Sequence, residues 1–213
     1  MFKRNPRSYM RIIAEFFYPR GGWYRAAGYV IHRLRRLPDP PHRISRGIAA
    51  GVFACFTPFY GLHFVTAAGL SWLMGGNVLA SLLATFFGNP LTFPLIASVS
   101  VELGSWMLGL PVDMYLPQIM GSFSHASAEL WHNFMAAFTD DVAVWDGLHR
   151  FFRRVFMPYL VGGLIPGVIS GLIAYALSRP VITAYQKRRI KKLKHRYAVR
   201  MAEQAAKADA ASQ

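Results

Sequence analysis

The feature that most constrains this sequence is a long stretch with almost no charge. Between Gly47 and Val112 there are 66 residues and a single charged side chain, Glu102. A second stretch, from Val155 to Ser178, has 24 residues and no charge. About 20 apolar residues suffice to cross a bilayer as a helix, and a soluble fold of this length could hardly bury both runs. The sequence therefore predicts an all-α integral membrane protein.

The charges gather at the two ends of the chain. The net charge of the 213 residues is +14; residues 1–46 contribute +9, residues 178–213 contribute +8, and residues 47–177 contribute −3. Because Lys and Arg next to membrane spans stay in the cytoplasm, both termini are predicted to be cytoplasmic. Basic residues that flank an apolar block, instead of lining one face of a folded domain, argue against nucleic acid as the partner.

The changes in charge after residues 46 and 177 divide the chain into three predicted parts. Residues 1–46 form basic cytoplasmic or interfacial helices, with amphipathic helical spacing over residues 8–37 and a break at Pro19–Gly22. Residues 47–177 form the membrane domain, in which residues 155–177 are the last span. Residues 178–213 form a polybasic amphipathic helix and a frayed tail. That helix suits an anionic lipid surface, with RNA as the alternative ligand. Its predicted lipid contacts are Lys187, Arg188, Lys191, Lys192, Lys194 and Arg196.

The apolar block from 47 to 110 is interrupted by three turn signals. These are Pro58-Phe-Tyr-Gly61, Gly75-Gly-Asn77 and Gly88-Asn-Pro-Leu-Thr92, which leave segments 47–57, 62–74, 78–87 and 93–110. The first three segments are shorter than the ~17 residues that a span needs. Short helices joined by Pro and Gly turns predict broken or re-entrant helical hairpins. The alternative is a pair of Pro-kinked helices, Gly47–Met74 and Val78–Leu110.

Counting membrane crossings favours the hairpin. Two cytoplasmic termini require an even number of crossings, and residues 155–177 supply one, so the block must contribute an odd number. The acid-rich connection 111–149 then lies outside the cell. In it, His125, Glu129 and His132 share one helix face and are competent metal ligands, although a solvated polar face is the stronger interpretation. No metal or other cofactor is predicted.

The two turns that contain Pro58 and Pro90 are the candidate site. Backbone opened at membrane depth must be buried in protein or line a wet cavity. We expect the turns to face each other around a polar cavity. Glu102 is expected near it, because a charge inside a span costs ~2.5–3.5 kcal/mol on insertion scales and therefore marks a functional candidate. The cavity candidates are Pro58, Tyr60, Gly61, His63, Asn89, Pro90, Thr92 and Glu102. Alternatively, Asn89 and Thr92 satisfy only their own turn and His63 is a core histidine.

Small residues at helical spacing predict close contacts between helices. Gly163, Gly167 and Gly171 recur every four residues in the last apolar segment, and Gly47 and Gly51 do so in the first. Such faces meet either within one chain or between chains, in a homo-oligomer.

Two segments of the block are similar to a known family. GVFACFTPFYGLHF at residues 51–64 and GNPLTFP at residues 88–94 resemble a bacterial membrane-protein family known only as a domain of unknown function. The resemblance covers about residues 47–157. It implies an integral protein of the bacterial inner membrane, and family members joined to envelope glycosyltransferases imply a connection with lipid-linked precursors.

The sequence carries no motif of catalysis. It contains no Gly-x-Ser-x-Gly, no His-Glu-x-x-His and no phosphate-binding glycine loop, so no enzymatic activity is predicted. One function that remains is a small transporter or flippase-like protein for an envelope lipid or amphipathic solute, which broken helices suggest. The other is a non-catalytic membrane scaffold or accessory subunit that binds anionic lipid or a cytoplasmic partner. A wet cavity between the turns favours the transporter, and a dry, glycine-packed core favours the scaffold.

Overall fold

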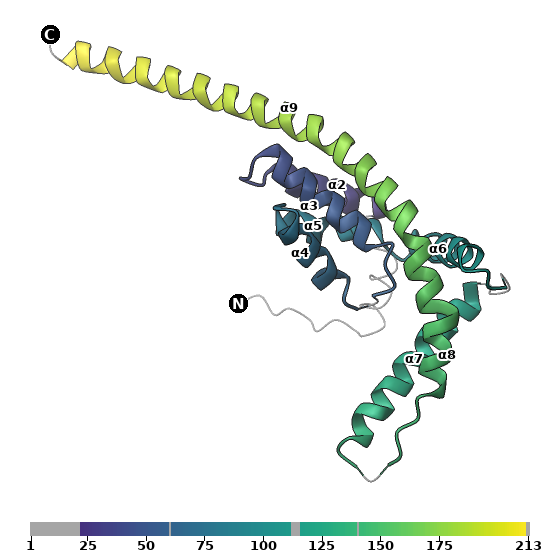
Figure 1. Ribbon diagram of the computed structural model, residues 1–213. Coiled ribbons are helices and arrows are strands. Elements are labelled where there is room, and N and C mark those ends of the chain that lie inside the picture. Colours follow the sequence, from purple (N-terminus) through teal and green to yellow (C-terminus); the bar gives the residue numbers. More distant parts are fainter. Residues whose placement is uncertain (1–21, 60, 112–115, 140, 212–213) are drawn as a thin grey trace.

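The computed structural model describes residues 22–59, 61–111, 116–139 and 141–211, and every regular element within them is a helix. The elements are α2 (Gly22–Arg35), α3 (Pro41–Ala54), α4 (His63–Leu73), α5 (Val78–Ala84) with a 3-10 turn at Thr85–Phe87, α6 (Phe93–Met107), α7 (Leu116–Ala136), α8 (Asp146–Phe151), a π-helical turn at Phe152–Phe156 and α9 (Met157–Ala211) (Figure 1). The helix expected before Pro19 lies outside the described residues.

The three turn signals separate the helices of the apolar block as predicted. Pro58 lies between α3 and α4, Gly75 follows α4, and Pro90 precedes α6. Gly61 has a φ of +77° and Gly75 a φ of +60°, which glycine adopts without the strain that a side chain brings. The alternative of two continuous kinked helices is therefore wrong.

Helices α3, α4 and α5 form a small bundle in which the chain reverses twice. At the end of α4, the Asn77 amide donates to the Arg43 carbonyl at 2.8 Å, so α4 has returned to the start of α3. Helix α5 then runs parallel to α3, because Gly47 lies against Ala80 and Gly51 against Ala84. The boundary expected at residue 46 falls inside α3, which begins at Pro41 with proline in its first turn.

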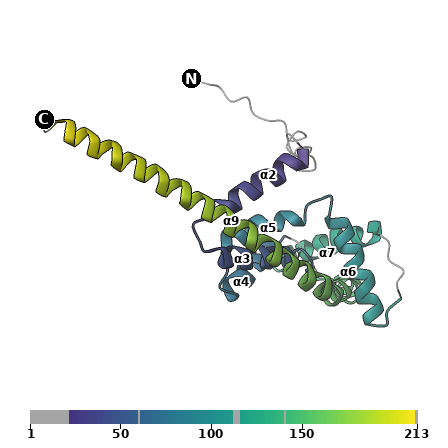
Figure 2. The same cartoon turned by 90° about the horizontal axis from the view of Figure 1, so that it is seen from above.

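Helix α9 is the long element against which α3 and α6 pack (Figures 1 and 2). Helix α3 runs antiparallel to it, since Ala49 lies beside Gly171 and Phe56 beside Gly163. Farther along, Ile182 of α9 is buried with Ile44 of α3. The start of α3 therefore lies toward the C-terminal part of α9.

Helix α6 crosses α9 near the other end of this contact, and α7 begins there. Gly104 of α6 lies against the backbone of Pro158 and Gly162. Ile119, in the first turn of α7, is buried with Val155. Between Ile44 and Ile119 the chain has therefore passed from the Ile182 end of the bundle to the Val155 end.

Helix α9 continues without a break through both of its prolines. The last apolar segment 155–177 and the polybasic helix within 178–213, expected as separate elements, belong to one helix of 55 residues that contains Pro166 and Pro180. Proline in a helix removes a hydrogen bond, but Ile182 in the following turn is buried against Leu37 and Ile44, which holds the chain helical. Figure 1 shows that α9 is bent and that its C-terminal part projects beyond the bundle.

Length and composition single out one apolar helical segment. Within the described residues, one helical segment, Asp146–Ala202, is long and apolar enough to cross a membrane. The apolar stretches Val78–Phe87 and Phe93–Met107 are shorter.

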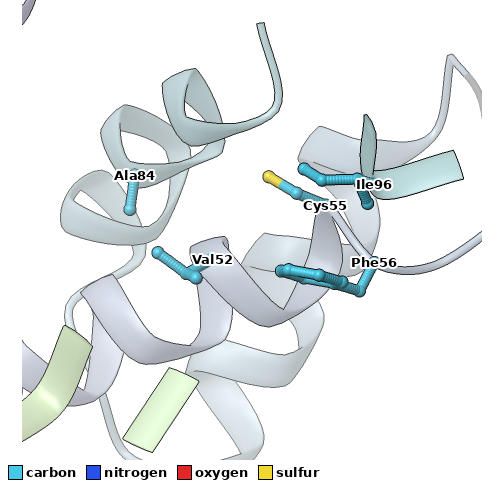
Figure 3. Packing of buried hydrophobic residues seen from close by; sticks show 5 residues of the cluster. All are labelled: Val52, Cys55, Phe56, Ala84 and Ile96. Carbon is cyan, nitrogen blue, oxygen red and sulfur yellow. The ribbon is translucent and has the colours of Figure 1, made fainter. Parts of the chain in front are cut away.

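The core of the bundle lies where α3, α5 and α6 meet. Val52, Cys55 and Phe56 at the end of α3 are buried with Ala84 of α5 and Ile96 of α6 (Figure 3). These residues lie directly behind the two proline turns. The packing of α3 therefore decides where those turns stand.

Candidate functional site

The two proline turns line one groove of about 610 Å³. The first turn contributes Gly61, His63 and Phe64, and the second contributes Gly88, Asn89 and Pro90. Helix α2 closes one side with Trp23 and Val30, and the other lining residues are Cys55, Leu82, Leu83, Thr85, Phe86 and Phe93. The turns thus share a cavity, and aliphatic and aromatic side chains form most of its wall. We call it the apolar groove.

The polar groups of Asn89 and Thr92 form hydrogen bonds within their own turn. The Asn89 Oδ1 accepts from the amides of Leu91 at 2.9 Å and Thr92 at 3.2 Å, and its Nδ2 donates to the Phe86 carbonyl at 3.2 Å. The Thr92 hydroxyl donates to the Phe87 carbonyl. Thr92 is not among the groove residues. Both polar side chains therefore bond the opened backbone of their own turn, which is the alternative that the sequence left open for Asn89 and Thr92.

This turn gives a prediction about stability. Thr92→Val keeps the shape of the side chain but removes the hydroxyl, so it should lower the free energy of unfolding by about 0.5–1.5 kcal/mol, the net contribution of a typical hydrogen bond. Thr92→Ser keeps the hydroxyl and should lose less. Thermal unfolding of the purified protein in detergent measures both, and equal losses would show that the methyl group matters instead.

Gly88, the glycine of the second turn, is needed because it has no side chain and not because its backbone angle is unusual. Gly88 has a φ of −85°, so its conformation is open to other residues. A Cβ atom on it would lie 2.9 Å from the Cys55 sulfur, closer than side chains tolerate. Gly88 thus lets the second turn approach the end of α3.

Of the remaining cavity candidates, some line the groove and others do not. His63 is partly buried, lines the groove and is hydrogen bonded to the backbone of Thr57. Pro58 is buried and does not line the groove, and Tyr60 lies outside the described residues. Glu102 is exposed on α6 and does not reach the groove, because Val101 and Ser105 hold the other face of α6 in the core.

The glycine faces predicted from the sequence are used inside the chain. A methyl group on Gly47 or Gly51 would overlap backbone oxygens of Asn77 or Ser81, and one on Gly163 would overlap the carbonyl oxygen of Phe56. Each of these faces is occupied by a neighbouring helix of the same chain. The pattern therefore does not require a second copy of the chain.

A second groove, of about 440 Å³, lies between the end of α2 and the C-terminal part of α9. Its residues are Arg36, Tyr185, Arg189, Lys192, Leu193 and Arg196, and we call it the cationic groove. Of the predicted lipid contacts, Lys192 and Arg196 belong to it, while Lys187, Arg188, Lys191 and Lys194 do not line it. The sequence prediction missed Arg36 and Arg189. The spacing of Tyr185, Arg189, Lys192 and Arg196 could have revealed the shared face, whereas nothing in the sequence points to Arg36.

One of the candidate metal ligands in the connection, Glu129, ties two helices together. Glu129 accepts a hydrogen bond from the Gly147 amide at 3.1 Å, which ties α7 to α8. Within the residues that the structure describes, no three His, Cys, Asp or Glu side chains are grouped as a metal site.

Comparison with known proteins gives a family but no activity. No curated protein and no solved structure matches the chain. Residues 24–191 match the family described as "Uncharacterized protein conserved in bacteria (DUF2062)". These residues include most of α2, all of α3 to α8, and α9 as far as Lys191. Outside the match lie Trp23 of the apolar groove and Lys192, Leu193 and Arg196 of the cationic groove. The match covers well over half of the sequence, and the chain therefore belongs to this uncharacterized bacterial family.

Proposed function

We propose that this protein is an integral protein of the bacterial inner membrane that binds the apolar chain of a lipid in the apolar groove. In this proposal it is a non-catalytic accessory protein. The observation that carries the proposal is the wall of the groove: both turns line it, yet the polar groups of Asn89 are engaged within the turn.

The surface of the bundle supports a membrane location. Only 22% of the apolar window of the long helix is buried, unlike the core helix of a soluble protein. Helix α4 also turns large apolar side chains outward, with Val65, Trp72 and Leu73 between 68% and 74% exposed. Large exposed apolar surfaces mark contact with a membrane or another protein.

The path of the chain supports cytoplasmic termini and a re-entrant hairpin. Ile44 lies beside Ile182 and Ile119 beside Val155, so the basic stretches of α2 and α9 lie at the same end of the bundle. If α9 crosses the membrane, the chain from Ile44 to Ile119 makes one net crossing in the opposite direction. Helix α3, with 14 residues, is about 21 Å long and is shorter than the ~30 Å hydrocarbon core. It turns back at Pro58 as a re-entrant helix does.

The apolar groove has the size and lining of a ligand site. Its volume of about 610 Å³ falls within the ~300–1,000 Å³ of typical small-molecule sites. Inside a bilayer the hydrophobic effect does not distinguish the groove from surrounding lipid, so packing and shape decide what binds. Trp23, Phe64 and Phe86 supply flat walls for this packing.

A transporter or flippase-like role has less support. Such a protein passes a polar group across the membrane and needs polar side chains or water along the path. Asn89 and Thr92 face their own backbone, and Glu102 lies away from the groove. The core behind the turns is closed by glycine contacts.

Filling the groove tests the proposal. Leu83 lines it, whereas Leu79, one turn earlier on α5, is 45% exposed and does not. Leu83→Trp should reduce the lipid retained by the purified protein by at least about fivefold, because an indole takes the space of the bound chain and cores tolerate little added volume. Native mass spectrometry of protein released from detergent counts the bound lipids.

Leu79→Trp is the matched control and should retain lipid as the natural protein does. Equal retention by Leu83→Trp would contradict the proposal, provided that the variant unfolds at a similar temperature. Movement of a polar headgroup probe across the membrane of vesicles that contain the natural protein would favour the transporter instead.

A further inference from the structure

The cationic groove brings together basic side chains from one face of α9 and from the end of α2. Tyr185, Arg189, Lys192 and Arg196 are spaced by four, three and four residues, so they share one helix face. That face turns toward Arg36 at the end of α2. Lys187, Lys191 and Lys194 have helical positions on the opposite side of α9.

Buried contacts hold the two helices in this position. Leu37, directly after Arg36, is buried with Ile182 of α9. One turn farther along, the Gln186 Nε2 donates to the Asp39 carbonyl at 2.9 Å. The backbone positions of Arg36 and Arg189 are therefore set by packing, although both side chains are exposed.

The four cations of the groove lack a carboxylate partner within the described part of the chain. The nearby carboxylate of Asp39 accepts from Asn77 Nδ2 at 2.5 Å and lies 3.5 Å from Arg43. It therefore belongs to the start of α3. Four like charges on a concave surface repel one another, and a bound anion removes this repulsion.

We propose that the cationic groove binds a phosphate group that carries at least two negative charges, such as a phosphomonoester or a diphosphate. Three of its four cations are arginines, whose planar guanidinium groups make paired hydrogen bonds to phosphate oxygens. Tyr185 can add a hydroxyl donor. This site is separate from the apolar groove, and the inference goes beyond the proposed function.

The height of the groove agrees with a lipid headgroup as one source of the phosphate. The uncharged stretch of α9 ends at Ser178, and Tyr185 follows about 10 Å farther along the helix axis. In the proposed membrane path this is the level of the headgroups. A soluble phosphate compound carries the same chemistry, and the test separates the two sources.

The test compares two lipids with the same chains. The full-length protein is placed in phosphatidylcholine nanodiscs with either dioleoyl phosphatidic acid, a phosphomonoester, or dioleoyl phosphatidylglycerol, a singly charged diester. The natural protein should bind phosphatidic acid in preference to phosphatidylglycerol. The triple variant Arg189→Gln, Lys192→Gln and Arg196→Gln should lose that preference by about tenfold or more, since each charge-assisted hydrogen bond is strong.

Matched variants separate the groove from general charge. Changing Lys187, Lys191 and Lys194 to Gln removes the same charge from the opposite face and should leave the preference intact. Likewise, Arg36→Gln should weaken it, whereas Arg33→Gln, on the same helix but outside the groove, should not. Equal losses from the two triple variants, in protein of unchanged helicity, would overturn the proposal, as would equal binding of the two lipids.

Inorganic pyrophosphate then identifies the source. If pyrophosphate displaces phosphatidic acid from the natural protein, the groove recognises the phosphate group alone. If phosphatidic acid binds with the expected dependence on Arg36 and Arg189 but resists pyrophosphate, the lipid headgroup is the ligand. If neither phosphatidic acid nor pyrophosphate binds, the proposal is wrong.

Discussion

Replacing Gly104 by alanine is expected to prevent stable folding of this protein. A single methyl group at this position would overlap the carbonyl oxygen of Pro158, and it would also crowd Gly162. Both obstacles are backbone, so no side chain can rotate away. Helix α6 must then move off α9, and the free energy of unfolding should fall by about 3 kcal/mol or more. Thermal unfolding in detergent and the yield of monodisperse protein measure the effect.

Gly69 on α4 supplies the matched control. A Cβ atom there meets nothing within 4 Å, and the residue is exposed on a helix of the same bundle. Gly69→Ala should leave stability unchanged or raise it by up to ~1 kcal/mol, the helix preference of alanine over glycine. If the two variants unfold at the same temperature, the α6–α9 contact is looser than described.

The second large effect concerns which residues face the two sides of the membrane. In a Cys55→Ala background, Thr139→Cys should react with a membrane-impermeant maleimide in intact cells, because it lies in the connection between α7 and α8. Arg200→Cys and His42→Cys should react only after the cells are opened. All three positions are exposed, so the difference reports the side of the membrane and not burial.

Two outcomes would contradict this topology. Labelling of Arg200→Cys but not Thr139→Cys in intact cells would invert the protein and conflict with its basic ends. Labelling of both in intact cells would mean that α9 does not separate them. The re-entrant interpretation of α3 and α4 depends on the same result, because it assumes one net crossing before α7.

The sequence predicted the helices of the apolar block well because their ends depend on local chemistry. Gly61 needs its positive φ, and Pro58 and Pro90 lack a backbone donor. These properties act within a few residues and can be seen in the sequence. The expected segment 62–74 and the observed α4, His63–Leu73, differ by one residue at each end.

Features that depend on distant partners could not be predicted in the same way. The spacing of Gly163 and Gly167 predicted a close contact, but only the fold shows that Phe56 fills it. The change from apolar to basic residues after residue 177 predicted two elements, whereas the burial of Ile182 keeps α9 continuous. The polarity of Asn89 left two interpretations open, a wet cavity or a side chain that closes its own turn, and only the folded turn shows its hydrogen bonds.

The antiparallel contact of α3 with α9 has a consequence for synthesis of the protein. Phe56 finds its partner Gly163 only after more than a hundred further residues have been added to the chain. At ~5–20 residues per second, this wait is on the order of ten seconds. During that time the face of α3 that α9 later covers, with Ala49, Phe53 and Phe56, stays without its partner. In the proposed membrane topology, the first half of the chain therefore needs other contacts to cover this face until the last helix emerges.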